Sequence, residues 1–232
     1  MMKLSVIVPV LNEKATLAEV LDRILKVDIP ASKEIIVIDD GSTDGSTEIV
    51  RSYVQANPGV IKAVYRKKPG GKGNAIQEAT PHMTGGIVII QDADLEYDIG
   101  DYGRLIAPII NNEAEVVFGS RFLGSIERMK PQHLLANRIL TFLANFIYGI
   151  KITDEATGYK VVRADVFKRF GMQAKKFEFC PEVVAKSARL KCRIVEVPVK
   201  YRARTVKEGK KIKWHDAIDA VWALVKYRFW KG

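Results

Sequence analysis

The chain has 232 residues, of which 47% are hydrophobic and 28% charged, a composition typical of one large folded domain or one domain with an appendage. Its 37 Lys and Arg against 27 Asp and Glu give a formal net charge of +10, which favours an anionic partner such as nucleic acid, a phosphorylated substrate or an anionic membrane. Two cysteines argue against a disulfide framework or a zinc site. We find neither a signal-peptide cleavage site nor an apolar run of roughly 18 residues, so we expect a cytoplasmic protein without a membrane span.

Strand-like and helix-like segments alternate through the first half of the chain. Continuous apolar runs, typical of strands buried on both faces, predict strands at 4–10, 34–38, 60–65, 87–90 and 115–119. Apolar residues at helical spacing lie between them. This alternation predicts an α/β fold with a mostly parallel sheet flanked by helices.

Polar residues follow three of these strands, at 9–13, 39–44 and 92–96. Ligands of open parallel sheets bind beyond the carboxyl ends of the strands, so we expect these residues to share one site. The loop 67–73 adds lysines and glycines, and Lys72 suits a phosphate, although such a loop alone is equally consistent with an ordinary connection. Neither G-x-G-x-x-G nor a complete phosphate-binding Walker loop is present. The pattern predicts a pocket for a nucleotide diphosphate.

Carboxylates alternate directly after the apolar run 87–90, at Asp92, Asp94 and Glu96. Carboxylates are costly in an apolar interior unless they are paired, so we expect them to face a cleft and to share a cation. Hard oxygen ligands suit Mg²⁺ or Mn²⁺. An acidic turn that caps the next helix is the alternative.

Four motifs together resemble the family 2 glycosyltransferases of GT-A fold. They are V-I-V-P-V-L-N-E at 6–13, I-V-I-D-D-G-S-T-D at 36–44, G-G-K-G-N-A at 70–75 and D-A-D-L at 92–95. The resemblance covers about residues 3–200. Within the family the chain is most similar to polyprenyl-phosphate hexosyltransferases such as dolichyl-phosphate mannosyltransferase. That narrower similarity rests on F-G-S-R at 118–121, A-T-G-Y-K-V at 156–161 and V-P-V-K-Y-R-A-R at 197–204.

The resemblance implies an inverting, metal-dependent transfer of mannose or glucose, from GDP-mannose or UDP-glucose, to a polyprenyl phosphate of the dolichyl type. The implied nucleotide-sugar site comprises Pro9, Asn12, Glu13, Asp39, Asp40, Lys72 and Asp92, the metal site Asp94 and Glu96, and the catalytic set Asp92, Asp94 and Arg121. Glu96 stands where the dolichyl branch often has Gln, which leaves the choice between Mg²⁺ and Mn²⁺ open. Arg121 and Arg204 match positions for the acceptor phosphate, and we add Arg138 from its place on an apolar helix.

The second half of the chain predicts two helices that suit a membrane surface. Apolar residues of 132–150 cover more of the helix than a normal core-facing stripe, so this helix is either deeply buried or lies in the membrane interface. From Lys207 onward, lysines precede a helix that carries Trp214, Trp222 and Phe229 on one face. That pattern suits a headgroup layer, and docking of the same face onto the protein is the alternative.

We therefore predict a GT-A catalytic domain over residues 1–204, which includes the acceptor or interface helix 132–150, and a basic amphipathic C-terminal helix over 205–232. The predicted location is the cytoplasmic face of a membrane, with peripheral attachment. Nucleic acid is not expected as a partner, because no RNA- or DNA-binding module is recognisable.

Two other functions are compatible with parts of the pattern. A family 2 transferase with a soluble or glycan acceptor would use Asp154 or Glu155 as a base. A non-catalytic protein that binds nucleotides or nucleic acid would not need the carboxylates Asp92, Asp94 and Glu96. Retention on liposomes separates the first alternative from the polyprenyl-phosphate transferase.

Overall fold

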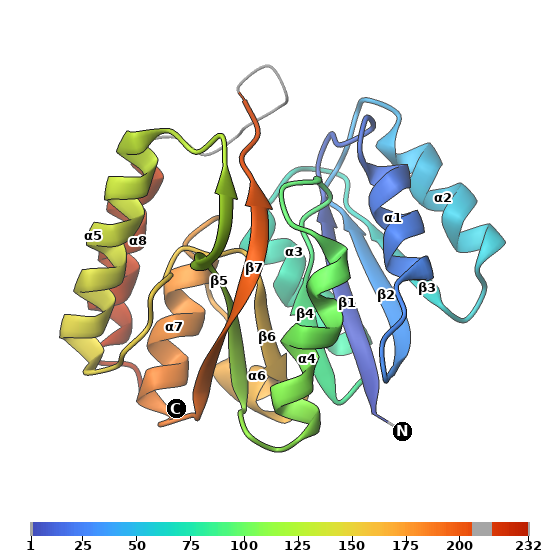
Figure 1. Ribbon diagram of the computed structural model, residues 1–232. Coiled ribbons are helices and arrows are strands. Elements are labelled where there is room, and N and C mark those ends of the chain that lie inside the picture. Colours follow the sequence, from blue (N-terminus) through green and yellow to red (C-terminus); the bar gives the residue numbers. More distant parts are fainter. Residues whose placement is uncertain (1, 206–214, 232) are drawn as a thin grey trace.

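The computed structural model describes residues 2–205 and 215–231, and a seven-stranded sheet forms the centre of this part of the chain (Figure 1). The strands are β1 (Lys3–Val10), β2 (Ser32–Asp39), β3 (Ile61–Tyr65), β4 (Ile87–Ile90), β5 (Val116–Glu127), β6 (Lys160–Arg163) and β7 (Ile194–Arg202). The longer helices are α1 (Leu17–Lys26), α2 (Ser46–Ala56), α3 (Lys72–Ala79), α4 (Tyr102–Ile110), α5 (Pro131–Tyr148), α6 (Ala164–Phe170), α7 (Phe179–Arg189) and α8 (His215–Tyr227). Short 3₁₀ turns lie at Thr80–His82 and Ile99–Asp101.

The strands lie in the order β3-β2-β1-β4-β6-β5-β7. Neighbours are parallel except for β6, which runs antiparallel to both β4 and β5. The chain order reverses between β1 and β4, and their carboxyl ends meet at the same edge of the sheet. Such a switch point is where open α/β sheets bind their ligands.

The five strands predicted in the first half are present, and the mostly parallel sheet is confirmed. The fifth, β5, is longer than predicted. An irregularity between Ser120 and Ser125 lets its second part continue beside β7. This extension stays paired with β7 and leads the chain toward α5 (Figure 1).

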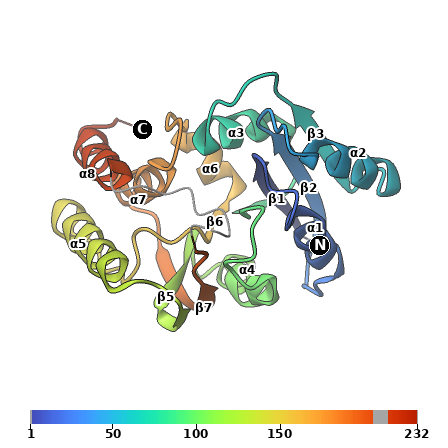
Figure 2. The same cartoon turned by 90° about the horizontal axis from the view of Figure 1, so that it is seen from above.

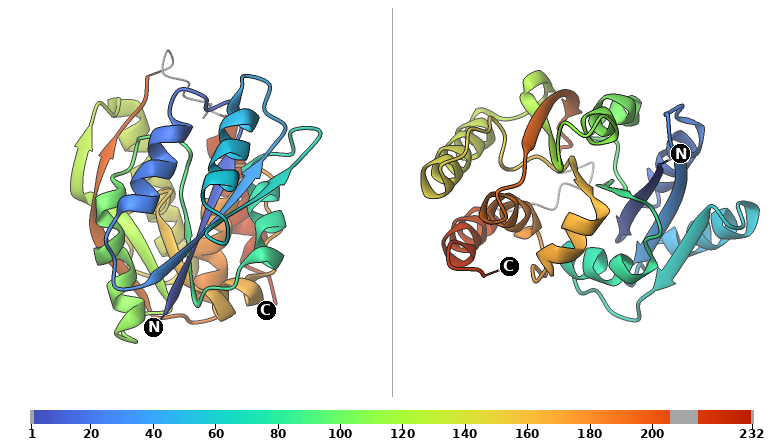
Figure 3. Two further views of the ribbon diagram at one scale, coloured as in Figure 1. Left: turned by 90° about the vertical axis from the view of Figure 1, so that its right-hand side faces the viewer. Right: turned by 90° about the horizontal axis from the view of Figure 1, so that it is seen from below.

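Side chains of the strands pack against helices on both faces of the sheet. On one face Val6, Ile35 and Ile89 lie in a core with α1, α2 and α4, and α1 lies beside α2 (Figure 3). On the other face Ile7 and Val88 lie in a second core with α3, α6 and α7. Because both faces are covered, the strands are apolar without interruption, as β4 (I-V-I-I) is.

Helices α5 and α8 form an outer pair that contacts α7 (Figure 2). Leu140 and Ala144 are the buried apolar residues of α5, while Ala223, Leu224 and Tyr227 are buried in α8. Other large apolar side chains of the pair are exposed, namely Leu135, Ile139, Phe142 and Phe146 on α5 and Ile218, Val221, Trp222 and Val225 on α8, with Phe229 just beyond it. We call this set the outer apolar face.

The outer apolar face answers a question that the sequence left open. Neither helix packs against the protein by the outer apolar face. Each helix uses another side for packing and leaves the outer apolar face exposed. The lysines at 207–213 and Trp214 lie outside the described residues, and the predicted boundary at 204 stays a prediction. Among the described residues, no helix combines the length and apolarity needed to cross a membrane.

Candidate active site

A cavity of about 670 Å³ lies at the carboxyl ends of β1 and β4, and α5, α7, β7 and the first turn of α8 also contribute to its walls. Of the residues predicted for the site, it brings together Pro9, Glu13, Lys72, Asp92, Asp94, Glu96, Arg121 and Arg204. Asn12, Asp39, Asp40 and Arg138 are not among its lining residues. The cavity thus joins groups from three strand ends with arginines from the second half of the chain.

Arg204 is the centre of an acidic cluster within the cavity. Its guanidinium Nη2 lies 2.8 Å from Oδ2 of Asp94, and Nη1 lies 3.0 Å from Oε2 of Glu13. Glu96 accepts a hydrogen bond from the Arg204 backbone N–H at 2.6 Å and another from the Tyr201 hydroxyl at 3.1 Å. The buried Nε of Arg204 has no hydrogen-bond partner within the described chain. This Nε lies 3.9 Å from Oε1 of Glu96, so the Arg204 guanidinium is surrounded by three carboxylates.

The acidic cluster carries more negative charge than Arg204 balances. Burial and, after it, the charges of Asp92 and Glu96 raise the pKa of Asp94, Arg204 opposes them, and the net result is a pKa of about 7. A carboxyl group so perturbed in a cleft is typical of a functional site.

The same residues fit a divalent cation that a ligand helps to hold. In the described residues, no group of three or more His, Cys, Asp and Glu side chains is placed to bind a metal unaided. Mg²⁺, however, usually takes one or two carboxylates and completes its shell with substrate phosphates and water. Asp94 and Glu96 supply that number of carboxylates, and the excess negative charge around Asp94 favours a cation.

Lys72 stands at the start of α3 and faces the acidic cluster. Its Nζ lies 2.6 Å from Oδ1 of Asp92. Burial lowers the pKa of Lys72, but Asp92, Cys180 and Asp94 together outweigh this effect and the net shift is upward, so the lysine is charged. The loop before it is fixed by Asp40, which accepts hydrogen bonds from the backbone N–H groups of Gly70 and Gly71 and pairs with Arg66. Asp40 therefore holds the Lys72 loop from outside the cavity.

Asp39 and Asn12 also bind protein groups. Asp39 is buried and accepts hydrogen bonds from the Ser42 backbone and the Thr47 hydroxyl. Asn12 has a positive φ of 52°, and its side-chain oxygen accepts a hydrogen bond from the Thr43 backbone. Both residues thus brace the loop after β2. Their predicted contacts with the nucleotide remain predictions.

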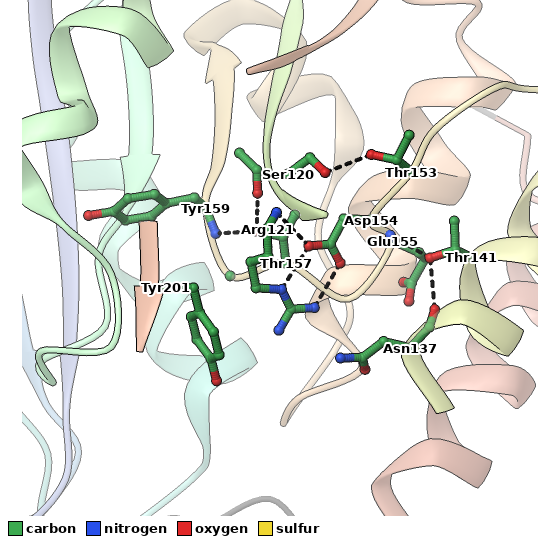
Figure 4. A network of polar contacts seen from close by, with 12 residues as sticks. Ser120, Arg121, Asn137, Thr141, Thr153, Asp154, Glu155, Thr157, Tyr159 and Tyr201 are labelled. Carbon is green, nitrogen blue, oxygen red and sulfur yellow. Dashed lines mark hydrogen bonds and ion pairs between the residues drawn. The ribbon is translucent and has the colours of Figure 1, made fainter. Parts of the chain in front are cut away.

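Arg121 is held rigidly in the cavity wall (Figure 4). Its Nε and Nη2 each donate to a different oxygen of Asp154 at 2.7 Å, and its guanidinium lies 5.1 Å from the centre of the Tyr201 ring. Glu196 in turn accepts from the backbone N–H of Asp154 at 3.1 Å. A bidentate pair of this kind fixes the orientation of an arginine before a ligand binds.

Arg138 is placed differently from the other predicted arginines. It lies on the exposed side of α5, and its guanidinium stacks 4.1 Å from the centre of the Phe122 ring. The structure therefore does not bring Arg138 to Arg121 and Arg204. An arginine that interrupts an apolar helix marks its exposed face as readily as a binding site.

Two residues that the sequence analysis did not use in the site are Tyr97 and Tyr201. Tyr97 stacks on Tyr201 with ring centres 4.9 Å apart, and its hydroxyl accepts a hydrogen bond from the Gly158 backbone at 2.7 Å. Both tyrosines line the cavity. Tyr201 lies within V-P-V-K-Y-R-A-R, where it shares the strand face of Val199, so the alternation of β7 was the signal that could have found it.

Comparisons with known proteins agree with this geometry. A family model described as Glycosyl transferase family 2 matches residues 5–171. The dolichyl-phosphate beta-glucosyltransferase of Dictyostelium discoideum is 29% identical, with 97% of this chain and 74% of that protein covered. The dolichol-phosphate mannosyltransferase of Pyrococcus furiosus is 26% identical over 100% of this chain and 65% of that protein. The chain spans between about half and three quarters of the length of the curated relatives it matches.

Among solved structures, glucosyl-3-phosphoglycerate synthase from Mycobacterium tuberculosis, in complex with Mn²⁺, uridine diphosphate and phosphoglyceric acid, superposes with a TM-score of 0.72. The alignment covers 100% of this chain and 80% of that chain at 20% identity. This likeness concerns the fold, and the GT-A fold expected from the sequence is confirmed.

Proposed function

Because the chain belongs to glycosyl transferase family 2 and is therefore a glycosyltransferase, we propose that it transfers a hexose from a nucleotide sugar to a polyprenyl phosphate, with inversion at the anomeric carbon. The observation that carries this proposal is the single cavity in which a carboxylate cluster faces Lys72, Arg121 and Arg204. Such a site has separate groups for a cation, a diphosphate and a second phosphate. The names of the two curated relatives support a polyprenyl phosphate as acceptor.

In the proposed complex the donor lies over Asp92 and Lys72. Lys72 is charged and pairs with Asp92 in the free protein, so it is placed to bind a phosphate oxygen while Asp92 turns to a sugar hydroxyl. Asp94 and Glu96 would hold Mg²⁺ or Mn²⁺ together with the diphosphate. A divalent cation there supplies stabilisation of the negative charge that develops on the departing diphosphate.

The acceptor phosphate is proposed to lie between Arg121 and Arg204. The second pKa of a phosphate monoester is about 6, so its oxygen is already anionic near neutral pH and no strong base is required. That oxygen forms the new bond to the anomeric carbon, and the bond from this carbon to the diphosphate breaks with its electron pair on the diphosphate. Two arginines reduce the repulsion between the anionic acceptor and the anionic donor.

The outer apolar face supports peripheral attachment to the membrane that holds the acceptor. Its side chains gather on α5 and α8, and the inner sides of the same two helices contribute Leu140, Ala217 and Ala220 to the cavity wall. A lipid surface against this face would bring a membrane-bound phosphate near the arginines. We propose the cytoplasmic face of the membrane, as the sequence analysis does.

Substitution of Asp94 by Asn tests the role of the acidic cluster. Removal of a metal ligand should abolish Mg²⁺- or Mn²⁺-dependent transfer, and EDTA should do the same to the wild type. Asp98→Asn is the matched control. Asp98 lies on the same loop, caps a 3₁₀ turn and does not line the cavity. Full activity of Asp94→Asn, or of the wild type in excess EDTA, would contradict the metal assignment.

A further inference from the structure

Glu155 is a buried carboxyl group for which the described chain provides no partner. The residue is fully buried, and neither Oε1 nor Oε2 has a hydrogen bond within the described residues. Its neighbour Asp154, equally buried, is fully engaged by Arg121. A buried carboxyl oxygen without a partner is costly, and it needs either a functional reason or a ligand.

Two hydrogen bonds fix the backbone of Glu155. The Glu155 N–H donates to the Thr141 hydroxyl of α5 at 3.0 Å, and the Glu155 carbonyl accepts from Nζ of Lys160 at 2.8 Å. Burial raises the pKa of Glu155 to about 7, against the opposing charge of Lys160 and with a smaller contribution from Asp154. Figure 4 shows Glu155 next to Asp154, on the side of α5.

Glu155 also lines the cavity, as do Asp92 and Lys72 of the proposed donor site. Cys180 helps to place Glu155 relative to Lys72 and Asp92. It lines the cavity, and its Sγ lies 3.4 Å from the carbonyl oxygen of Thr157. Burial raises the pKa of Cys180, and the charges of Lys72, Asp92 and Glu155 all act on it. Glu155 and the Lys72–Asp92 pair therefore both lie near Cys180 in the cavity wall.

We propose that Glu155 binds a hydroxyl group of the transferred sugar and selects neutral hexoses against uronic acids. The inference rests on the proposed function, because it assumes a nucleotide-sugar donor over Asp92. A sugar hydroxyl supplies the hydrogen bond that Glu155 lacks. A sugar carboxylate in the same position would place a second acidic group beside Glu155. The nearby cations, Lys160 and Arg121, already donate hydrogen bonds to groups of the protein.

Selection of this kind follows from the cost of a buried polar group without a hydrogen bond. A site built to hydrogen-bond a hydroxyl rejects analogues that leave its buried polar group unpaired. Glu155 thus acts as a specificity-determining residue, and the proposal requires no proton transfer from it during the reaction.

The test is calorimetric binding of donors to the full chain without an acceptor. It is done at pH 8, where the Glu155 carboxyl, with a pKa of about 7, is ionised. The probes are two pairs, UDP-glucose with UDP-glucuronate and GDP-mannose with GDP-mannuronate, with UDP and GDP alone as references. The wild type should bind the hexose donor at least about tenfold more tightly than the uronate of the pair whose nucleotide it prefers. Glu155→Gln removes the charge and should lower this preference at least about tenfold, whereas Glu155→Asp keeps the charge and should retain exclusion of the uronate.

Nucleotide diphosphate affinity should be the same in all three proteins, and this separates a specificity role from a structural one. Equal affinity of the wild type for both members of its preferred pair, or an unchanged preference in Glu155→Gln, would overturn the inference. If Glu155→Gln fails to fold, the preference of the wild type and of Glu155→Asp for the hexose donor over the uronate still tests the inference. Failure of UDP and GDP to bind at all would remove the proposed donor and this inference together, whereas donor selection without transfer to a polyprenyl phosphate would contradict only the proposed acceptor.

Discussion

At the scale of single residues, the carboxylates of this chain divide into two groups by what they contact. Asp39, Asp40 and Asp154 bind backbone groups, hydroxyls or arginines that belong to the protein, and so they hold the site together. Asp94 and Glu155 are buried with too little positive charge or too few donors nearby. A ligand can therefore supply the second group with the positive charge or the hydrogen-bond donors that the protein lacks there.

The sequence predicts Asp39 and Asp40 of the first group and Asp94 of the second with the same kind of motif, because D-D-G and D-x-D state only that carboxylates follow a strand. Which oxygen binds the protein and which faces the cavity depends on where the loops of β2 and α3 meet, a contact between distant segments. Glu155 was considered as a base for a soluble acceptor, but its lack of partners depends on packing that periodicity does not reveal.

Glu155→Gln should change the pH dependence of stability. The folded pKa of Glu155 is about 7 against an ordinary value of 4.5, so between these values the folded protein keeps a proton that the unfolded chain loses. The free energy of unfolding of the wild type therefore falls as pH rises through this window, by at most about 3 kcal/mol from this group. Urea denaturation of the variant and the wild type at pH 5 and pH 8 should give a larger stability gain for the variant at pH 8.

Glu113→Gln provides the control for this measurement, because Glu113 lies exposed in the turn before β5. Its stability relative to the wild type should be the same at both pH values. An equal difference at pH 5 and pH 8 for Glu155→Gln would mean that Glu155 is ionised in the folded protein at pH 5.

At the scale of elements, α5 and α8 determine how the protein meets its surroundings. Each helix has apolar residues on more than one side, so the sequence predicts amphipathic helices but does not say which side packs. The structure decides this through α7, because Leu224 and Tyr227 of α8 and Ala144 of α5 are buried at the inner side of the pair. The larger Phe142, Trp222 and their neighbours stay outside, an extent of exposed apolar surface that usually marks an interaction site.

The double substitution of Phe142 and Trp222 by Ser should remove binding to vesicles of anionic phospholipid while the fold is kept, because both side chains are about two-thirds exposed, at 68% and 66%. Co-sedimentation at increasing salt measures the effect. Binding of the wild type should weaken strongly between 0.1 M and 1 M salt, where the Debye length falls from about 10 Å to about 3 Å, without vanishing if the aromatic side chains insert.

Tyr65→Ser is the matched control, since Tyr65 is 41% exposed at the other edge of the sheet, on β3. Deletion of residues 207–232 is a poorer test, because it also removes the buried Leu224 and Tyr227. Wild-type protein that does not sediment with vesicles at low salt would rule out peripheral attachment by this face and would favour a soluble acceptor.

At the scale of the whole molecule, alternating strands and helices predict the parallel half of the sheet, from β1 to β4, and the edge at which its ligands bind. The position of β6 could not be predicted in this way. It is four residues long and pairs antiparallel with β4 and β5, partners that lie far from it in the chain. The segment before this strand carries Glu155 to the cavity wall beside α5 and Asp154 to Arg121. Non-local pairing thus builds the part of the site that the strand-end motifs do not contain.

The most direct measurement of the proposed function is the identity of the product. The full chain would be incubated with GDP-mannose or UDP-glucose, a short-chain polyprenyl phosphate and Mg²⁺ or Mn²⁺, and the lipid extract analysed by mass spectrometry and by the anomeric configuration of the sugar. We predict a polyprenyl phosphate that carries one hexose with inverted configuration. Hexose found only on a soluble hydroxyl acceptor, or nucleotide diphosphate released with free sugar and no lipid product, would contradict the account.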